Sequence, residues 1–106
     1  MVFNTGAALL DAIVLAVVSK EQEGTYGYKI TQDVRSVIDI SESTLYPVLR
    51  RLQKEECLEV YDMAIDGRNR RYYKITEKGR VQLKLYKGEW AGYSRKISQI
   101  FEEAFI

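Results

Sequence analysis

The side chains with the most distinctive chemistry lie in two short segments near the middle of the chain. The first is an expected helix whose outer face carries hydroxyl, aromatic and basic residues: Ser43, Thr44, Tyr46, Pro47, Arg50 and Lys54. Such a face can enter the major groove of DNA, where hydroxyls and lysine bind phosphates or bases and arginine pairs with guanine. The plainer alternative is the solvated face of an amphipathic helix, and the exposed aromatic Tyr46 followed by Pro47 argues against it.

The second segment is a basic turn that runs into a strand. Arg68, Arg70 and Arg71 fall within four positions beside a glycine, with Asn69 between them. Arginines at a hairpin tip can reach phosphates or a minor groove, and Asn69 tolerates a left-handed conformation and can bind a phosphate. Strand alternation separates Arg70 from Arg71, so one of the two arginines can serve structure instead. The alternative is a solvated hairpin tip without a partner.

Length and charge limit what the rest of the chain can do. The 106 residues are enough for one domain with a small core. The net charge is only +1, so the case for nucleic acid depends on local clustering. Between positions 43 and 80, nine lysines and arginines stand against six acidic residues, and the excess of three is concentrated at the helix face and the turn.

The sequence lacks the residues that most enzymes and metal sites use. It contains no histidine, no glycine-rich phosphate loop and no metal-ligand cluster. We therefore expect no catalytic residue, no metal and no cofactor. Cys57 is the single cysteine and is expected to be a buried structural thiol rather than a redox sensor. The apolar stretch from Leu9 to Val18 is too short to span a bilayer, which predicts a cytoplasmic protein with no membrane partner.

Apolar periodicity and capping residues predict two helices in the first third of the chain. Thr5 can cap a helix that runs to about Lys20, with apolar residues on two sides that suit a core and a partner subunit. Thr25 can cap a second helix from about Tyr26 to Ile38.

The middle of the chain predicts a third helix followed by a hairpin. Ser41 or Ser43 is the expected cap of this helix, because Pro47 is tolerated only near a helix start. Its inward residues are expected to be Leu45, Val48, Leu49 and Leu52. Residues 58–63 and 71–76 are the expected strands, and Asp66 followed by Gly67 is a tight-turn signal.

The last predicted helix begins after Thr76 and runs to about Phe105. Its apolar residues follow alternating spacings of four and three, which is a heptad seam typical of helices that pack on a partner. We expect a dimer interface made of Leu9, Ile13, Tyr86, Trp90, Tyr93, Ile97, Ile100 and Phe101. The alternative is that this helix folds back onto the first helix of its own chain.

Trp90 permits two interpretations. It is either a core aromatic of the dimer seam or, with Tyr86 and Tyr93, part of an aromatic cavity that takes flat apolar ligands. The residues themselves do not choose between these interpretations.

Taken together, the motifs resemble those of the PadR family of bacterial transcriptional regulators. The similarity includes Tyr26-Gly27-Tyr28, Thr44-Leu45-Tyr46-Pro47, and Gly67-Arg68 followed by Arg71-Tyr72-Tyr73 and Thr76-Glu77-Lys78-Gly79. It covers roughly residues 8 to 80. The resemblance implies a winged helix, a homodimer clasped by the C-terminal helix and, in most members, repression of nearby genes. It also adds Tyr28 to the expected DNA-contacting residues.

The sequence therefore predicts a mostly helical α+β fold with a winged helix-turn-helix domain at 1–76 and a dimerisation helix at 77–106. The predicted function is a homodimeric repressor that binds palindromic double-stranded DNA and is released by a small apolar or aromatic effector or another signal. The competing interpretations are a winged helix used for protein–protein contacts and a small-molecule-binding protein without a DNA target.

Overall fold

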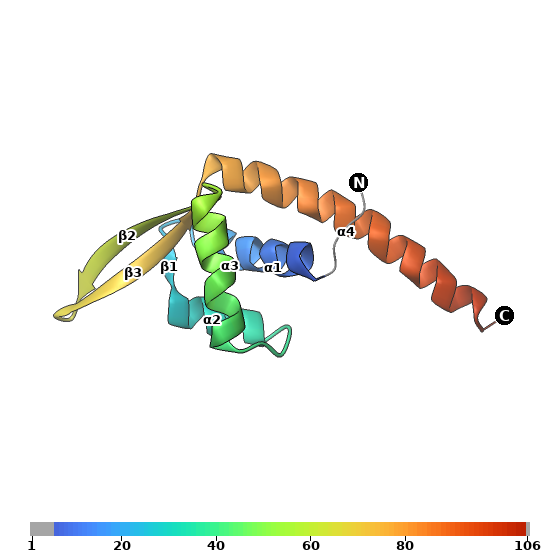
Figure 1. Ribbon diagram of the computed structural model, residues 1–106, viewed down its shortest axis with the longest axis horizontal. Helices are drawn as coiled ribbons and strands as arrows, with labels where there is room; N and C mark the ends of the chain where they lie inside the picture. The colour runs from blue at the N-terminus through green and yellow to red at the C-terminus, as the bar shows by residue number, and fades with distance from the viewer. Residues whose placement is uncertain (1–5, 106) are drawn as a thin grey trace.

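The computed structural model describes residues 6–105, which form four helices and a three-stranded antiparallel sheet (Figure 1). Their bounds are α1 (Ala7–Ser19), β1 (Thr25–Tyr26), α2 (Gly27–Arg35), α3 (Glu42–Lys54), β2 (Leu58–Ile65), β3 (Arg68–Ile75) and α4 (Glu77–Glu103). The mostly helical α+β winged helix predicted from the sequence is confirmed. The predicted cap of α1, Thr5, lies outside the described residues.

The hydrophobic core lies where α1, α2 and α3 meet the base of the sheet. Its fully buried side chains include Leu15, Ile30, Leu45 and Leu49. The predicted inward face of α3 is confirmed, since Leu45, Val48, Leu49 and Leu52 are all buried. Because this side of α3 is apolar along its whole length, the opposite side must face outward.

The helix α3 begins where the capping chemistry predicts. Ser41 has extended backbone, and its hydroxyl accepts a hydrogen bond from the Thr44 amide at 3.3 Å. Ser41 rather than Ser43 is therefore the cap. Pro47 lies in the second turn, and α3 continues past it to Lys54.

The predicted second helix is wrong at both ends. Thr25 and Tyr26 form β1 instead of a cap and a first turn, and they pair antiparallel with Tyr73 and Tyr72 of β3. The helix α2 starts at Gly27 and stops at Arg35, short of Ile38. The partner strand lies more than forty positions away, so local periodicity could not reveal this pairing.

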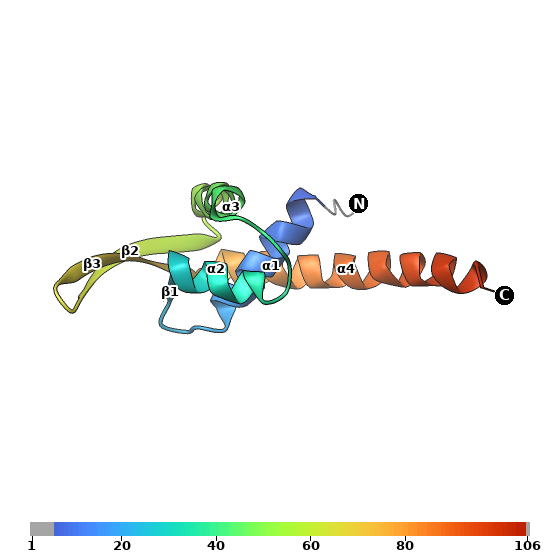
Figure 2. The same cartoon turned by 90° about the horizontal axis from the view of Figure 1, so that it is seen from below.

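The wing is a two-stranded hairpin that projects from one end of the molecule (Figures 1 and 2). The turn at Asp66 and Gly67 is confirmed, with φ angles of 52° and 74° that glycine adopts easily and aspartate tolerates. The two-residue turn pairs Ile65 with Arg68, so β3 starts at Arg68 rather than near Arg71. Asn69 is consequently a strand residue paired with Ala64 and does not use its left-handed tolerance.

The long helix α4 starts immediately after the hairpin. The Thr76 hydroxyl accepts a hydrogen bond from the Gly79 amide at 2.9 Å, which confirms the predicted cap. The first part of α4 runs alongside α1, and the rest extends beyond the other helices, so that the molecule measures 61 × 26 × 21 Å (Figures 1 and 2). The helix ends at Glu103, two residues before the expected end.

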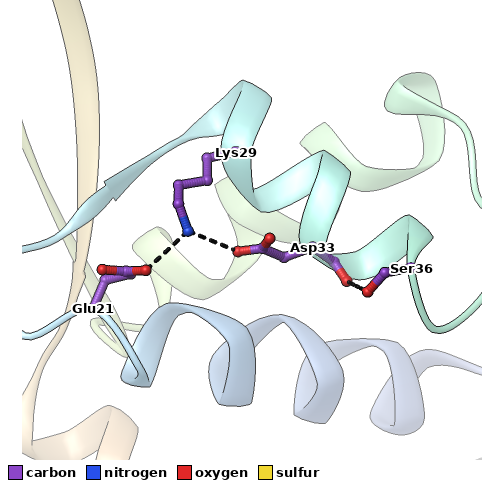
Figure 3. A network of polar contacts seen from close by, with 4 residues as sticks. All are labelled: Glu21, Lys29, Asp33 and Ser36. Carbon is purple, nitrogen blue, oxygen red and sulfur yellow. Dashed lines mark hydrogen bonds and ion pairs between the residues drawn. The ribbon is translucent and has the colours of Figure 1, made fainter.

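A small ionic network ties the loop after α1 to the helix α2. The Lys29 ammonium lies 2.9 Å from the Glu21 carboxylate and 3.2 Å from that of Asp33 (Figure 3). These two hydrogen bonds raise the pKa of Lys29. The Ser36 hydroxyl donates to the Asp33 carbonyl at 2.6 Å and so closes the last turn of α2 (Figure 3). Because the ion pairs are exposed, they orient the loop more than they stabilise the fold.

Candidate nucleic-acid interface

The outer face of α3 presents the side chains that the sequence predicts for DNA contact. Ser43, Thr44, Pro47, Arg50 and Lys54 are all exposed. The Ser43 and Thr44 hydroxyls lie 2.9 and 3.0 Å from the Ser41 hydroxyl, so all three meet at the start of the helix. This end of α3 offers hydroxyl donors and acceptors, and its later turns offer two cations.

Tyr46 differs from its neighbours because it is half-buried. Its ring lies against Gly27 at the start of α2, where an added Cβ would come within 2.9 Å of the tyrosine oxygen. A residue with a side chain at position 27 would therefore push the ring outward. The missing side chain of Gly27 leaves room for the Tyr46 ring to pack against the start of α2. This contact restricts the orientation of the ring more than full exposure to solvent would.

Four predicted contact residues lie at the surface of the wing, and two of its arginines have different neighbours. Arg68, Asn69, Arg70 and Arg71 are all exposed. The guanidinium of Arg70 lies over the ring of Tyr26, 4.7 Å from the ring centre, in a cation–π contact. The Arg71 Nε lies 3.7 Å from a carboxylate oxygen of Asp62 on β2. Sequence reasoning had no signal for the role of Tyr26, which depends on the pairing of β1 with β3.

A cleft of about 390 Å³ joins the two predicted segments. Its lining is formed by residues from β1, α2, α3 and β3, namely Tyr26, Gly27, Tyr46, Arg50, Arg70, Arg71 and Tyr73. Three of these side chains are cations and none is acidic. Burial raises the pKa of Tyr73 above its ordinary value. The cleft can therefore bind an anion such as a phosphate with guanidinium and phenol groups.

The remaining predicted contact residue, Tyr28, lies outside this cleft. It is on the first turn of α2 and is 60% exposed.

A partly buried ion pair that the sequence did not reveal joins α3 to α1. Two guanidinium nitrogens of Arg51 donate to the two carboxylate oxygens of Asp11, with the Nε to Oδ2 bond at 3.4 Å. Asp11 is only 5% exposed. The hydrogen bond to Asp11 raises the pKa of Arg51 above its ordinary value. Asp11 stands alone in an apolar run, and that isolation was the only available signal.

A second concave surface lies between α1 and α4, with a volume of about 840 Å³. We call it the α1–α4 groove, and its apolar lining is Leu9, Ala12, Ile13, Ala16, Val37, Ile38, Leu83, Tyr86 and Trp90. Arg80, Lys84 and Lys87 add cations at its edge. Four of the eight predicted interface residues, Leu9, Ile13, Tyr86 and Trp90, line this groove, and Tyr86 also packs against the core of its own chain.

The other predicted interface residues lie further along α4. The rings of Tyr93 and Trp90 are 6.2 Å apart, and Tyr93 and Ile97 are half-buried. Ile100 is 62% exposed and Phe101 is 64% exposed. These residues belong to the C-terminal part of α4, the helix that extends past the other helices (Figure 1).

Among residues 6–105, no helix is long and apolar enough to cross a membrane. The same residues contain no group of three or more histidine, cysteine or acidic side chains placed to hold a metal ion. Cys57 is buried as predicted, and burial raises the pKa of its thiol.

The fold and the interface define a class of protein. Three helices followed by a β-hairpin, with the third helix presenting a polar and basic face beside that hairpin, form a winged helix-turn-helix. Residues 14–85 match the family model for the transcriptional regulator PadR-like family. The chain belongs to this family of transcriptional regulators, in agreement with the motifs in its sequence.

The chain is also similar to individual proteins, one of which is described as a PadR-like transcriptional regulator. Protein X of Lysinibacillus sphaericus is 37% identical over 100 residues, which cover 89% of this chain and 88% of the relative. The solved structure of smu.1704 from Streptococcus mutans is 38% identical with a TM-score of 0.83, covering 96% of this chain and 94% of that one. A PadR-like transcriptional regulator from Bacillus cereus is 32% identical with a TM-score of 0.78, covering 88% and 91%.

The two neighbouring arginines of α3 are expected to behave oppositely on replacement. Arg51→Ala leaves the Asp11 carboxylate buried without its partner and should lower the free energy of unfolding by about 2 kcal/mol. Arg50→Ala removes an exposed side chain and should change it by less than about 0.5 kcal/mol. Urea unfolding of both variants at one fixed protein concentration measures the difference. Equal stability of the two variants would contradict a structural role for the ion pair.

Proposed function

We propose that this protein is a homodimeric repressor that binds a palindromic site on double-stranded DNA. The main support for this proposal is the cleft between α3 and the wing, which is lined by Tyr46 and Arg50 of α3 and by Arg70 and Arg71 of the wing. A helix and a hairpin that present cations to one concave surface can contact neighbouring parts of one DNA backbone. Membership in a family of transcriptional regulators supports the same function.

In this proposal, the outer face of α3 enters the major groove. Ser43 and Thr44, at the start of the helix, bind the backbone or a base edge, and Arg50 reads guanine or binds phosphate. Tyr46 and Pro47 add apolar contact, and Lys54 binds a phosphate. The first turn of α2 brings Tyr28 to the backbone.

The wing supplies most of the salt-sensitive affinity. Arg68 and Asn69 lie nearest the hairpin turn, and Arg70 and Arg71 lie closer to the cleft. Each arginine that neutralises a phosphate releases counterions and steepens the dependence of affinity on salt.

The homodimer is proposed from the apolar surface that one chain leaves uncovered. The α1–α4 groove is lined mainly by apolar side chains, and further along α4 the large apolar residues Ile100 and Phe101 are exposed. A second copy would cover these side chains with the same surface of its own. Residues 77–106 are then the dimerisation helix and residues 1–76 the DNA-binding domain. Two such domains would enter major grooves about 34 Å apart.

Release by a small molecule is the third part of the proposal. Trp90, Tyr86 and Tyr93 lie at the end of the α1–α4 groove or just beyond it, where an apolar or aromatic effector would find stacking partners. Because α1 contacts both this groove and α3, an effector that shifts α1 or changes the spacing of the two domains would weaken operator binding.

The first experiment is fluorescence anisotropy with duplex DNA from directly upstream of the gene for this protein, over a salt series and against a scrambled duplex. We expect saturable binding, preference for the upstream duplex and a steep salt slope. Arg68→Ala should weaken binding to both duplexes and flatten the slope by about one, because one phosphate contact is lost. Glu59→Ala, an exposed β2 substitution away from the cleft, is the control.

Other outcomes would assign a different function. Weak and equal binding to both duplexes would mean general electrostatic attraction. A folded protein that binds neither duplex at low salt would contradict DNA binding and favour a winged helix used for protein contacts.

The dimer is tested by a charge in the proposed seam. Ile97→Asp should convert a dimer to a monomer, because two symmetry-related carboxylates would be buried in an apolar interface. Ser98→Asp places the same charge on an exposed neighbouring position and should leave the dimer intact. Sedimentation equilibrium measures both masses. A dimer that survives Ile97→Asp would place the interface elsewhere.

The effector proposal is tested with the fluorescence of Trp90, the single tryptophan of the chain. Anilinonaphthalene sulfonate, a flat aromatic probe, is expected to quench this fluorescence and to weaken binding to the upstream duplex in the same concentration range. Quenching without any change in DNA affinity would mean that the groove binds ligands but does not regulate.

A further inference from the structure

Among the wing arginines, Arg70 is the one that stacks on an aromatic ring. Its guanidinium carbon lies 4.7 Å from the centre of the Tyr26 ring, and both residues line the cleft beside Arg50. Tyr26 is not among the residues predicted to contact DNA. It belongs to β1, the two-residue strand that sequence patterning assigned to a helix.

Tyr26 is itself held by a row of tyrosines across the sheet. The strand register places Tyr26 opposite Tyr72, and Tyr72 opposite Tyr61. The Tyr26 and Tyr72 rings meet edge to face with centres 5.6 Å apart, and the Tyr72 and Tyr61 rings stack at the same separation. The Tyr61 hydroxyl donates to the Glu23 carbonyl in the loop before β1, which anchors the outer end of the row.

This row lies at the surface of the sheet rather than in the core. The side chains of Tyr26, Tyr61 and Tyr72 are all half-buried, so their ring edges and faces remain at the surface. A free arginine side chain samples many rotamers, and fixing it on contact with an anion costs entropy. A planar guanidinium stacked on a ring has already lost part of that freedom.

The other wing arginines lack this arrangement. Arg71 faces the Asp62 carboxylate at 3.7 Å, and this acid partly neutralises it in the free protein. The ring under Arg70 carries no net charge, so Arg70 keeps its full positive charge toward an anion. Seating on a ring orients Arg70 without weakening its attraction to phosphate.

We propose that Tyr26 is a positioning residue for DNA binding, which holds the Arg70 guanidinium in the cleft where it meets the same phosphate backbone as Arg50. The inference rests on the proposed DNA-binding function and deepens it. Tyr26 acts through Arg70 and need not touch DNA itself.

The test is a double-mutant cycle on the upstream duplex, with wild-type protein, Tyr26→Ile, Arg70→Ala and the double variant. Isoleucine keeps the strand preference and the apolar contact with Tyr72 but removes the ring. We expect Tyr26→Ile to weaken binding about 2- to 5-fold, the range of an exposed cation–π contact. In the Arg70→Ala background the same change should have no further effect. Tyr26→Phe keeps the ring and should bind like wild type.

A measurement without DNA keeps the inference testable if Tyr26→Ile folds poorly. In the free wild-type protein and in Tyr26→Phe, the side-chain protons of Arg70 should show ring-current shifts in NMR spectra. Absence of those shifts would contradict the cation–π contact between Arg70 and Tyr26, and with it the inference.

The outcomes separate the inference from the function on which it rests. If wild type binds DNA and Tyr26→Ile weakens binding equally with and without Arg70, Tyr26 acts independently and the inference is wrong. If Arg70→Ala alone leaves binding unchanged, Arg70 makes no contact and the inference also fails, although the repressor proposal stands. If the wild-type protein binds no duplex, the proposed function fails first.

Discussion

The ion pair between Asp11 and Arg51 sets the orientation on which the interface depends. Successive residues of an α-helix point about 100° apart, so fixing Arg51 toward α1 turns the neighbouring Arg50 away from α1 and toward solvent. The paired atoms also satisfy a carboxylate that would otherwise be buried without hydrogen bonds. Apolar contacts along α3 hold the helix on the core, and the ion pair adds a directional constraint on its rotation that non-directional burial does not provide.

The helix α1 occupies the position that connects the two surfaces of this protein. One side of α1 carries Asp11 against α3, while Leu9, Ile13 and Ala16 line the α1–α4 groove. The proposed regulation needs an element that contacts both the α1–α4 groove and the DNA-contacting helix α3. A ligand in the groove can change DNA affinity only if it shifts structure that α3 also depends on. The proposed release of the operator therefore has a short physical route through a single helix.

Much of the interface was predictable from local patterns. The apolar spacing of α3 and the position of Pro47 fixed which side chains face outward, since a helix with one apolar stripe has a defined outer face. Asp66 and Gly67 defined the turn because few residues accept positive φ angles. The positions of Arg68 and Asn69 within β3, rather than in the turn, follow from the register of the hairpin, which local propensity does not define.

The class of fold, the polar face of α3 and the basic wing were predictable from local sequence, because each depends on residues close together in the chain. Tertiary structure decided the partners: Tyr26 beneath Arg70, Gly27 beneath Tyr46, and Asp11 beside Arg51. These contacts join positions about 20 to 45 residues apart. No periodicity or turn signal encodes such pairs, since they arise only when separate elements pack and bring distant side chains within a few ångströms.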